Sequence, residues 1–325
     1  MCAWLLEDAR YPVNNIFMEN EEIAPDQRAS QITSIDFAED PTGVSSSLRC
    51  HPGAVREENQ DCVGRFQIPL GEIFLVLDGV GGRSGGAQAS ALGLEEYGRF
   101  LSGLPAETDP LDGLQRATTW VKERLEEAKR FGPPEMQEMA STVALILIHE
   151  GVAYVGHIGD SRVYRVRGGR CTQLTRDHSV VERMIAEGLI SEDQAQTHPS
   201  SHILTRSLGQ PDASLELFSH EVQAGDVMLL CSDGLWAYAP TAQVQQTLVE
   251  PGASTTFIAD ALLHLALAGE AGDNISVVVL RVGEAWQATK RTQILTSKRF
   301  SQKQLLTALA ITTVLLAGAA VYLFL

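Results

Sequence analysis

Basic residues are scarce in this sequence, which carries 25 Lys and Arg against 41 Asp and Glu, a formal net charge of −16. A protein that binds nucleic acid through its phosphates needs an excess of Lys and Arg over the contact face, so we do not expect a nucleic-acid partner. Cysteine is also sparse. The five cysteines are irregularly spaced and include no CxxC pair, which argues against a disulfide framework or a zinc knuckle and favours reduced thiols.

Two further signals are missing. The N-terminus has Glu7 and Asp8 where a secretory signal would need a basic region and a long apolar core, so we expect the main domain to stay in the compartment where it is made. The sequence also contains no GxxxxGK[ST] string, which excludes a Walker-type phosphate loop.

A long apolar run is present at the C-terminus. Residues 305–325 carry no charge and, as a helix rising 1.5 Å per residue, would span about 31 Å, the thickness of a membrane's hydrocarbon core. The preceding flank is basic, as the positive-inside rule expects on the cytoplasmic side. We therefore expect a transmembrane helix at 305–325 in the cell membrane, a basic linker at 284–304, and a cytoplasmic domain. The basic residues are Lys290, Arg291, Lys298, Arg299 and Lys303.

The rest of the chain divides into two parts. Residues 1–45 are acidic and irregular, with Pro12, Pro25 and Pro41, and we expect a partly ordered extension. From 46 to 283, apolar runs of strand length alternate with helical patterns, which predicts one domain. The expected strands are 61–66, 73–77, 143–149, 152–156, 162–166, 227–231 and 276–281, and the expected helices are 87–101, 111–129, 180–187 and 254–267.

Short connections in the middle of the chain indicate the fold class. Residues 150–174 read as successive short strands, with Gly168 and Gly169 at a hairpin turn. Connections this short require antiparallel pairing, because a parallel crossover needs a dozen or more residues. The sequence therefore predicts an α+β fold with much antiparallel sheet.

Four aspartates stand at strand ends beside a glycine or a small polar residue. Asp78, Asp160 and Asp233 each follow an apolar run, and Asp273 leads into one. A single residue of this kind is usually a turn former that bonds its own backbone. Four of them, if their strands share sheets, meet at one rim, where their like charges call for cations among them. Carboxylates without His or Cys beside them suit Mg²⁺ or Mn²⁺ better than zinc.

The residues around Asp78 and upstream of it fit the same chemistry. Glycine follows at positions 79, 81 and 82, and without a Cβ the chain can bring the Gly79 carbonyl close to a metal that Asp78 binds. Arg56 and Asp61 stand five residues apart, and the planar fork of an arginine matches a phosphate dianion. Taken alone, Arg56 is more simply an exposed arginine on an acidic loop.

Seven sequence blocks, taken in order, resemble the metal-dependent serine/threonine protein phosphatases, the PPM or type 2C family, in their bacterial form. They are GAVREENQD, LVLDGVGG, MASTVALIL, HIGDSRVY, the long segment from LTRDHSVVER to ILTRSLG, LLCSDGLW and GDNISVVVL, and they cover residues from about 47 to 282. The resemblance implies two antiparallel β-sheets packed as a sandwich with helices outside, in four αββα layers, and a metal site at one edge.

The resemblance also implies metal-binding roles. Asp78 matches the aspartate that bridges two metal ions, and Gly79 matches its carbonyl ligand. Asp233 and Asp273 match the remaining ligands of the second ion. Asp160 matches a ligand of the weaker third ion of bacterial members. The cofactor implied is Mn²⁺ or Mg²⁺.

Other matching residues concern the substrate. Asp61 matches the acid that holds metal-bound water, and Arg56 matches the phosphate-binding arginine. Segment 175–209 matches a mobile flap, whose later part contains Ser200, Ser201 and Arg206. The implied function is hydrolysis of phosphoserine and phosphothreonine in proteins by water activated between two metal ions, in opposition to a Ser/Thr kinase. None of the cysteines lies in a C-x5-R loop, so a cysteine-phosphatase mechanism has no residues to use.

Two positions depart from the family pattern. Gln60 stands where the family usually has glutamate, and Val80 where eukaryotic members have histidine and bacterial members commonly have methionine. These departures motivate an alternative, a binding or regulatory module that has kept the fold and lost turnover. For Trp236 and the scattered histidines we expect packing or surface roles rather than contacts with substrate or metal. The histidines concerned are His149, His157, His178 and His198.

Overall fold

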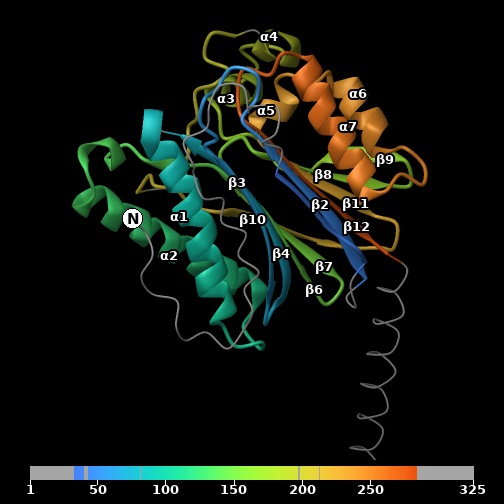
Figure 1. Ribbon diagram of the computed structural model, residues 1–325, viewed down its shortest axis with the longest axis horizontal. Coiled ribbons are helices and arrows are strands. Elements are labelled where there is room, and N and C mark those ends of the chain that lie inside the picture. Colours follow the sequence, from blue (N-terminus) through green and yellow to red (C-terminus); the bar gives the residue numbers. More distant parts are fainter. Residues whose placement is uncertain (1–32, 40–42, 81, 197, 212, 284–325) are drawn as a thin grey trace, which may run out of the picture.

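Two antiparallel β-sheets face each other in the computed structural model, which describes residues 33–39, 43–80, 82–196, 198–211 and 213–283 (Figure 1). The first sheet contains, in spatial order, β1 (Thr33–Phe37), β2 (Val44–His51), β12 (Ile275–Val282), β11 (Val227–Cys231), β8 (Arg162–Arg167) and β9 (Arg170–Gln173). The second contains β10 (Glu216–Glu221), β7 (Val152–Ile158), β6 (Val143–His149), β4 (Gly71–Val80) and β3 (Asp61–Ile68), and β5 (Ala140–Ser141) pairs with β4.

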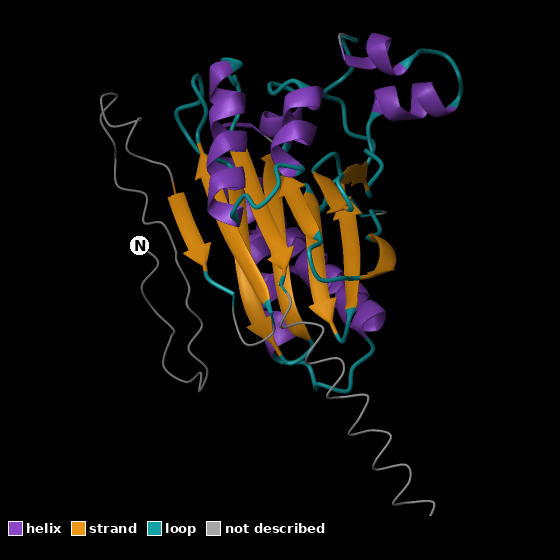
Figure 2. Cartoon of the chain, turned by 90° about the vertical axis from the view of Figure 1, so that its right-hand side faces the viewer, coloured by secondary structure: helices purple, strands orange, loops and turns teal. Residues whose placement is uncertain are grey.

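Helices cover the outer face of each sheet. α1 (Gly82–Ser102) and α2 (Pro110–Phe131) pack on the second sheet, and α6 (Thr241–Leu248) and α7 (Thr255–Ala268) pack on the first (Figure 1). The short helices α3 (Val180–Ala186), α4 (Glu192–Gln196) and α5 (Asp233–Trp236) lie near one end of the sandwich, and the turned view in Figure 2 shows helices that project beyond that end of the strands. A 3-10 turn, η2 (Pro134–Met136), follows α2. The expected αββα sandwich is present.

Strand β6 shows why these sequences form buried strands. Its side chains alternate, with Val143, Leu145 and Leu147 in the core beneath α1 and α2, and Ile146 and Ile148 in the core between the sheets. Both faces are covered, so the strand reads as a continuous apolar run. Each fully buried side chain of this size contributes about 1.5–3 kcal/mol to folding.

The N-terminal part of the described chain differs from expectation. Thr33–Phe37, which falls inside the predicted extension 1–45, forms β1 and pairs antiparallel with β2. The guanidinium of Arg49 on β2 is 1% exposed and bonds both Asp36 on β1 and Asp260 on α7. This ion-paired arginine joins the first strand to the helix layer above it.

The predicted fold class needs one correction, because it included a transmembrane helix. No helix in the described ranges is long and apolar enough to cross a bilayer. The two long helices, α1 and α2, carry apolar residues on the side that packs on the sheet and charged residues such as Glu95, Arg99 and Arg116 on the other. The segments 284–304 and 305–325, to which we assigned a linker and a span, lie outside the described residues.

Candidate active site

Asp61 and Asp78 lie directly opposite each other at the end of the second sheet. They are the paired residues at the start of β3 and near the end of β4. The Ser232 hydroxyl donates to Oδ2 of Asp61 at 2.7 Å. Thr142 and Ser141 hold the backbone of Asp78. Its N–H donates to the Thr142 hydroxyl at 3.0 Å, and its carbonyl accepts from the Ser141 hydroxyl at 2.9 Å. These bonds hold the carboxylate of Asp61 and the backbone of Asp78.

Asp233 and Asp273 come from the first sheet at the same end of the sandwich. β11 ends at Cys231, and Asp233 is the first residue of α5. Asp273 lies two residues before β12, the antiparallel neighbour of β11, in which Val277 pairs with Cys231. Because one strand ends where its antiparallel partner begins, both aspartates emerge at one edge.

Asp160 lies in the turn that leads from β7 in the second sheet to β8 in the first, and its side chain is buried. Its backbone carbonyl accepts the indole N–H of Trp236 on α5 at 3.1 Å. Arg162 stacks on Trp236, with its guanidinium carbon 3.8 Å from the ring centroid, and pairs with Asp177 at 2.7 Å. Trp236 therefore has the packing role expected for it.

These five carboxylates act on one another. Burial and then the charges of Asp61, Asp233, Asp160 and Asp273 raise the pKa of Asp78 well above its usual range. Burial and the charges of Asp160, Asp273 and Asp61 do the same to the pKa of Asp233. Burial raises the pKa of Asp61 to about 6 and that of Asp160 to about 7. Cations among these carboxylates would offset their mutual repulsion and favour the ionised forms.

Gly79 explains part of the glycine-rich loop. Its N–H donates to the Gln60 carbonyl at 3.0 Å, which brings the backbone of the β3 and β4 ends together. A Cβ at this position would overlap the carbonyl oxygen of Gly86 and stand 2.7 Å from that of Gln60. Glycine is therefore required where the start of α1 approaches the strand.

Arg56 lies at the exposed mouth of this group. Its Nη2 donates to Oδ2 of Asp273 at 2.9 Å, and about half of its side chain is exposed. Asn274 holds the loop that carries Arg56, since its side-chain N–H groups donate to the carbonyls of Pro52 and Glu58 and its oxygen accepts from the Gln60 N–H. Through these bonds Asn274, the residue after Asp273, holds the Arg56 loop beside the aspartates.

The segment expected to form a flap, 175–209, contains α3 and α4 (Figure 1). Its ends pair, because Ser179 and Leu204 form an isolated antiparallel bridge. Ser200 and Ser201 lie in a turn and donate their N–H groups to His198, and their described hydrogen bonds stay within that turn. Arg206 reaches Glu216 and His178 and not the aspartates. The structure therefore brings the aspartates and Arg56 together and leaves these three flap residues apart from them.

Several supporting residues were missed by the sequence reasoning. Ser232, Asn274, Ser141 and Thr142 orient the aspartates and the Arg56 loop. Their only signal was their place inside the blocks LLCSDGLW, GDNISVVVL and MASTVALIL. Among the described residues the cysteines are free thiols, as expected.

The two residues that depart from the family pattern occupy different settings. Gln60 accepts the Gly79 N–H and donates its own N–H to Asn274, both through its backbone. Val80 is 38% exposed at the end of β4. Both of these bonds of Gln60 come from the backbone, so they do not depend on the side chain at this position.

Comparison with known proteins decides the family. The Protein phosphatase 2C profile matches residues 54–273, two thirds of the chain. The chain belongs to the protein phosphatase 2C family. The "Serine/threonine phosphatase stp" of Listeria welshimeri is 30% identical to this protein phosphatase 2C member over 245 residues, which cover 73% of the chain and 95% of the Listeria protein. PstP of Mycobacterium tuberculosis is 31% identical over 236 residues, 73% of the chain and 44% of PstP.

Solved structures agree with this assignment. The crystal structure of Mycobacterium tuberculosis PstP/Ppp superposes with a TM-score of 0.68 at 29% identity and covers 74% of this chain and 99% of that one. The PstP catalytic domain in complex with two manganese ions superposes with a TM-score of 0.66 over the same shares. This member of the protein phosphatase 2C family is a metal-dependent serine/threonine phosphatase, and the enzyme class and the Mn²⁺ or Mg²⁺ requirement predicted from the motifs are confirmed.

Proposed function

We propose that four aspartates, Asp78, Asp160, Asp233 and Asp273, with the carbonyl group of Gly79, hold the divalent cations with which this phosphatase hydrolyses phosphoserine and phosphothreonine in proteins. Asp78 would bind both of two ions, and Gly79 would add its carbonyl as a ligand. Asp233 and Asp273 would be the remaining ligands of the second ion. Asp160 would bind a third. The supporting observation is the convergence of these carboxylates from both sheets on one edge, where burial and the charges of the surrounding aspartates raise the pKa of Asp78 and of Asp233.

The donor set fits hard cations. The five groups offer carboxylate oxygens and a backbone carbonyl, the ligands that Mg²⁺ and Mn²⁺ take in proteins, whereas zinc sites use His and Cys. The close backbone approach at Gly79 leaves no room for a side chain there. These features argue for a site built for cations rather than a chance cluster of acids.

When bound, the cations supply Lewis-acid stabilisation of the phosphoryl oxygens and lower the pKa of water. The residues of the chain do the rest. Arg56 offers a fork of N–H donors to the phosphate, and a phosphate that binds there replaces Asp273 as its partner. Asp61, whose Oδ2 is held by Ser232, orients water beside the phosphorus. Val80 has no proton to give, so the leaving group receives none from this position.

The substrates follow from the reaction. A phosphatase that removes phosphate from Ser and Thr in proteins opposes a Ser/Thr protein kinase. The proteins that such a kinase phosphorylates are therefore the proposed substrates, and the kinase itself is a functional partner. The net charge of −16 favours basic phosphopeptides over acidic ones by long-range attraction.

The test is hydrolysis of a phosphothreonine peptide with Mn²⁺, with a chelator, and by the Asp233→Asn variant. We expect both the chelator and the substitution to abolish turnover. Asp112→Asn, an exposed aspartate on α2, serves as the matched control and should keep full activity. Turnover that survives either the chelator or Asp233→Asn would refute the proposal.

The cellular location of the protein remains a prediction from the sequence alone. It depends on residues 284–325, which lie outside the described part of the structure. Fractionation of cells that produce the full chain measures it.

A further inference from the structure

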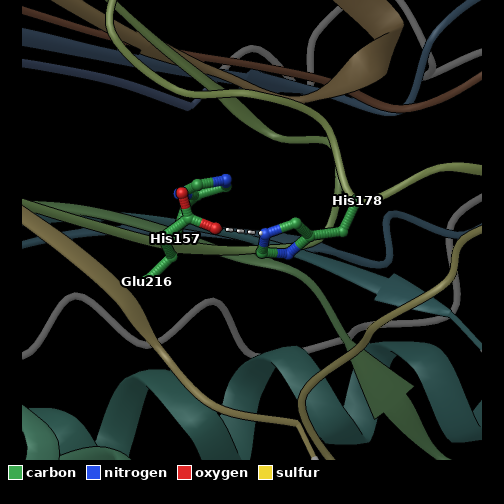
Figure 3. Close-up of side chains that lie close together, drawn as sticks. All are labelled: His157, His178 and Glu216. Carbon is green, nitrogen blue, oxygen red and sulfur yellow. Dashed lines mark hydrogen bonds and ion pairs between the residues drawn. The ribbon is translucent and has the colours of Figure 1, made fainter. Parts of the chain in front are cut away.

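Two histidines and a glutamate cluster together in the structure (Figure 3). They lie outside the group of aspartates, and His178 bonds Gly159, the residue before Asp160. His157 on β7 and Glu216 on β10 are direct cross-strand partners, and His178 from the start of the flap rests on them. The His178 and His157 rings stack with centroids 4.4 Å apart and planes at 23°. His178 Nε2 lies 3.0 Å from Glu216 Oε2. His157 is fully buried and His178 is 8% exposed.

The cluster resembles a metal site, because one ligand atom from each residue lies within 4.8 Å of the others. Its hydrogen bonds argue against that role. His178 Nδ1 accepts the Gly159 backbone N–H at 3.2 Å, which leaves the ring proton on Nε2, where the carboxylate oxygen of Glu216 at 3.0 Å is a nearer partner than Nη1 of Arg206 at 3.4 Å. A protonated nitrogen has no lone pair for a metal. Two stacked rings also hold their nitrogen lone pairs in nearly parallel planes, which disfavours convergence on one ion.

The hydrogen bonds instead join His178 to the turn that carries Asp160. The His178 N–H donates to the Gly159 carbonyl at 2.9 Å, and the Gly159 N–H returns a bond to the imidazole. Gly159 has φ +103°, a left-handed conformation that favours glycine, and it immediately precedes Asp160. The direction of the chain at Asp160 is therefore set by a residue of the flap.

The same histidine contacts both ends of the flap. The backbone carbonyl of His178 accepts the N–H of Thr205 at 2.8 Å. Arg206 Nη1 lies 3.8 Å from Oε2 of Glu216, the residue that His178 also contacts. His157 Nε2, at 2.8 Å, donates to the carbonyl of Arg176, two residues before His178. Both flap ends and the Asp160 turn thus meet at the cluster of His157, His178 and Glu216, through backbone as well as side-chain bonds.

We infer that His178 is a positioning residue, which holds the Gly159–Asp160 turn through Nδ1 and the flap on β10 through Nε2. Movement of the flap base is then transmitted to Asp160 by hydrogen bonds. This inference deepens the proposed function, and it rests on that proposal only where it concerns metal binding at Asp160.

Two substitutions separate the two nitrogens. Asparagine places its amide oxygen near the position of Nδ1, so His178→Asn keeps an acceptor for the Gly159 N–H. Glutamine places its amide nitrogen near Nε2, so His178→Gln keeps a donor for Glu216 and loses the bond to Gly159. His264, exposed on α7, supplies the matched controls His264→Asn and His264→Gln.

The first measurement is hydrogen exchange of the Gly159 amide in the metal-free protein. We expect exchange about three- to tenfold faster in His178→Gln and near the parent rate in His178→Asn, because only the former loses the bond. The ¹⁵N spectrum of the unsubstituted protein should show the His178 proton on Nε2. A proton on Nδ1, or equal exchange in the two variants, would overturn the inference. Neither result depends on turnover, so a failed activity test for Asp233→Asn leaves this measurement intact.

The second measurement is calorimetric titration with Mn²⁺. His178→Gln should weaken the weakest class of sites about three- to tenfold, and His178→Asn should not. In an Asp160→Asn background the glutamine substitution should have no further effect, because the coupled group is gone. An additive loss in that background would show a merely structural role and refute the coupling between His178 and Asp160. Zn²⁺ binding that requires both His178 and Glu216 would also overturn the inference, because it would make the cluster a metal site.

Discussion

Substituting Asp61 by asparagine should stabilise the metal-free protein at alkaline pH. Burial, with a smaller contribution from the charge of Asp273, raises the pKa of Asp61 from an ordinary 3.8 to about 6. At about 1.4 kcal/mol per tenfold change in proton affinity, the charged form costs the fold about 3 kcal/mol. Asparagine removes the charge and keeps an oxygen that accepts from Ser232. The substitution therefore removes a cost that the site carries for its function.

The sign of the pH dependence follows from the raised pKa. The protonated carboxyl stabilises the fold fully below about pH 4, and this contribution is lost as the pH rises through about 6. The gain from Asp61→Asn should accordingly be near zero at pH 4 and approach about 3 kcal/mol at pH 8. With Mn²⁺ present, the same variant should have a lower kcat/KM.

Urea unfolding in chelator between pH 4 and pH 8 measures this difference. Asp226→Asn is the matched control, because Asp226 is equally buried but pairs with Arg167 at 2.6 Å. Its substitution should destabilise the protein at pH 8, since it leaves the arginine without that partner. A gain from Asp61→Asn that is the same at pH 4 and pH 8, or a loss at pH 8, would refute the reasoning from buried charge.

Three further predictions concern neighbouring residues. Arg56→Ala should raise the KM for a phosphopeptide more than it lowers kcat, because it removes a ground-state phosphate contact; a selective fall in kcat would assign Arg56 to the transition state. Gly79→Ala should lower the free energy of unfolding by about 1–3 kcal/mol in thermal or urea melts, because its Cβ meets backbone oxygens, whereas Gly103→Ala, which has room, should change it little. Trp236→Phe should cost about 1 kcal/mol of stability, through the lost bond to the Asp160 carbonyl, with the KM unchanged; a raised KM would indicate substrate stacking instead.

The sequence predicted best the elements that are buried on both faces. β6 and β11 begin and end where we expected, because strands covered on both sides read as short apolar runs. β2 was missed because Ser46 and Ser47 are buried there through hydrogen bonds to Arg65 and Thr255, and small polar residues give no apolar signal. β10 was missed because it is an edge strand with a partly exposed, mixed sequence.

The site divides in the same way. Asp78, Asp160, Asp233 and Asp273 were predicted because each stands at one end of an apolar run, a pattern visible along the chain. The bonds of Ser232 and Asn274 were missed because they join residues far apart in the sequence. His157 and His178 were expected to have structural or surface roles. Their meeting with Glu216 depends on the pairing of β7 with β10, a strand that the pattern did not reveal.

The pairing of β1 with β2 bears on how the catalytic region is best produced by itself. A fragment that starts at residue 45 would uncover the backbone edge of β2 and leave Arg49 with one acidic side chain in place of two. An uncovered, well-formed strand edge invites other chains to add to it, so such a fragment is prone to aggregate. Expression boundaries placed ahead of Thr33 avoid that outcome.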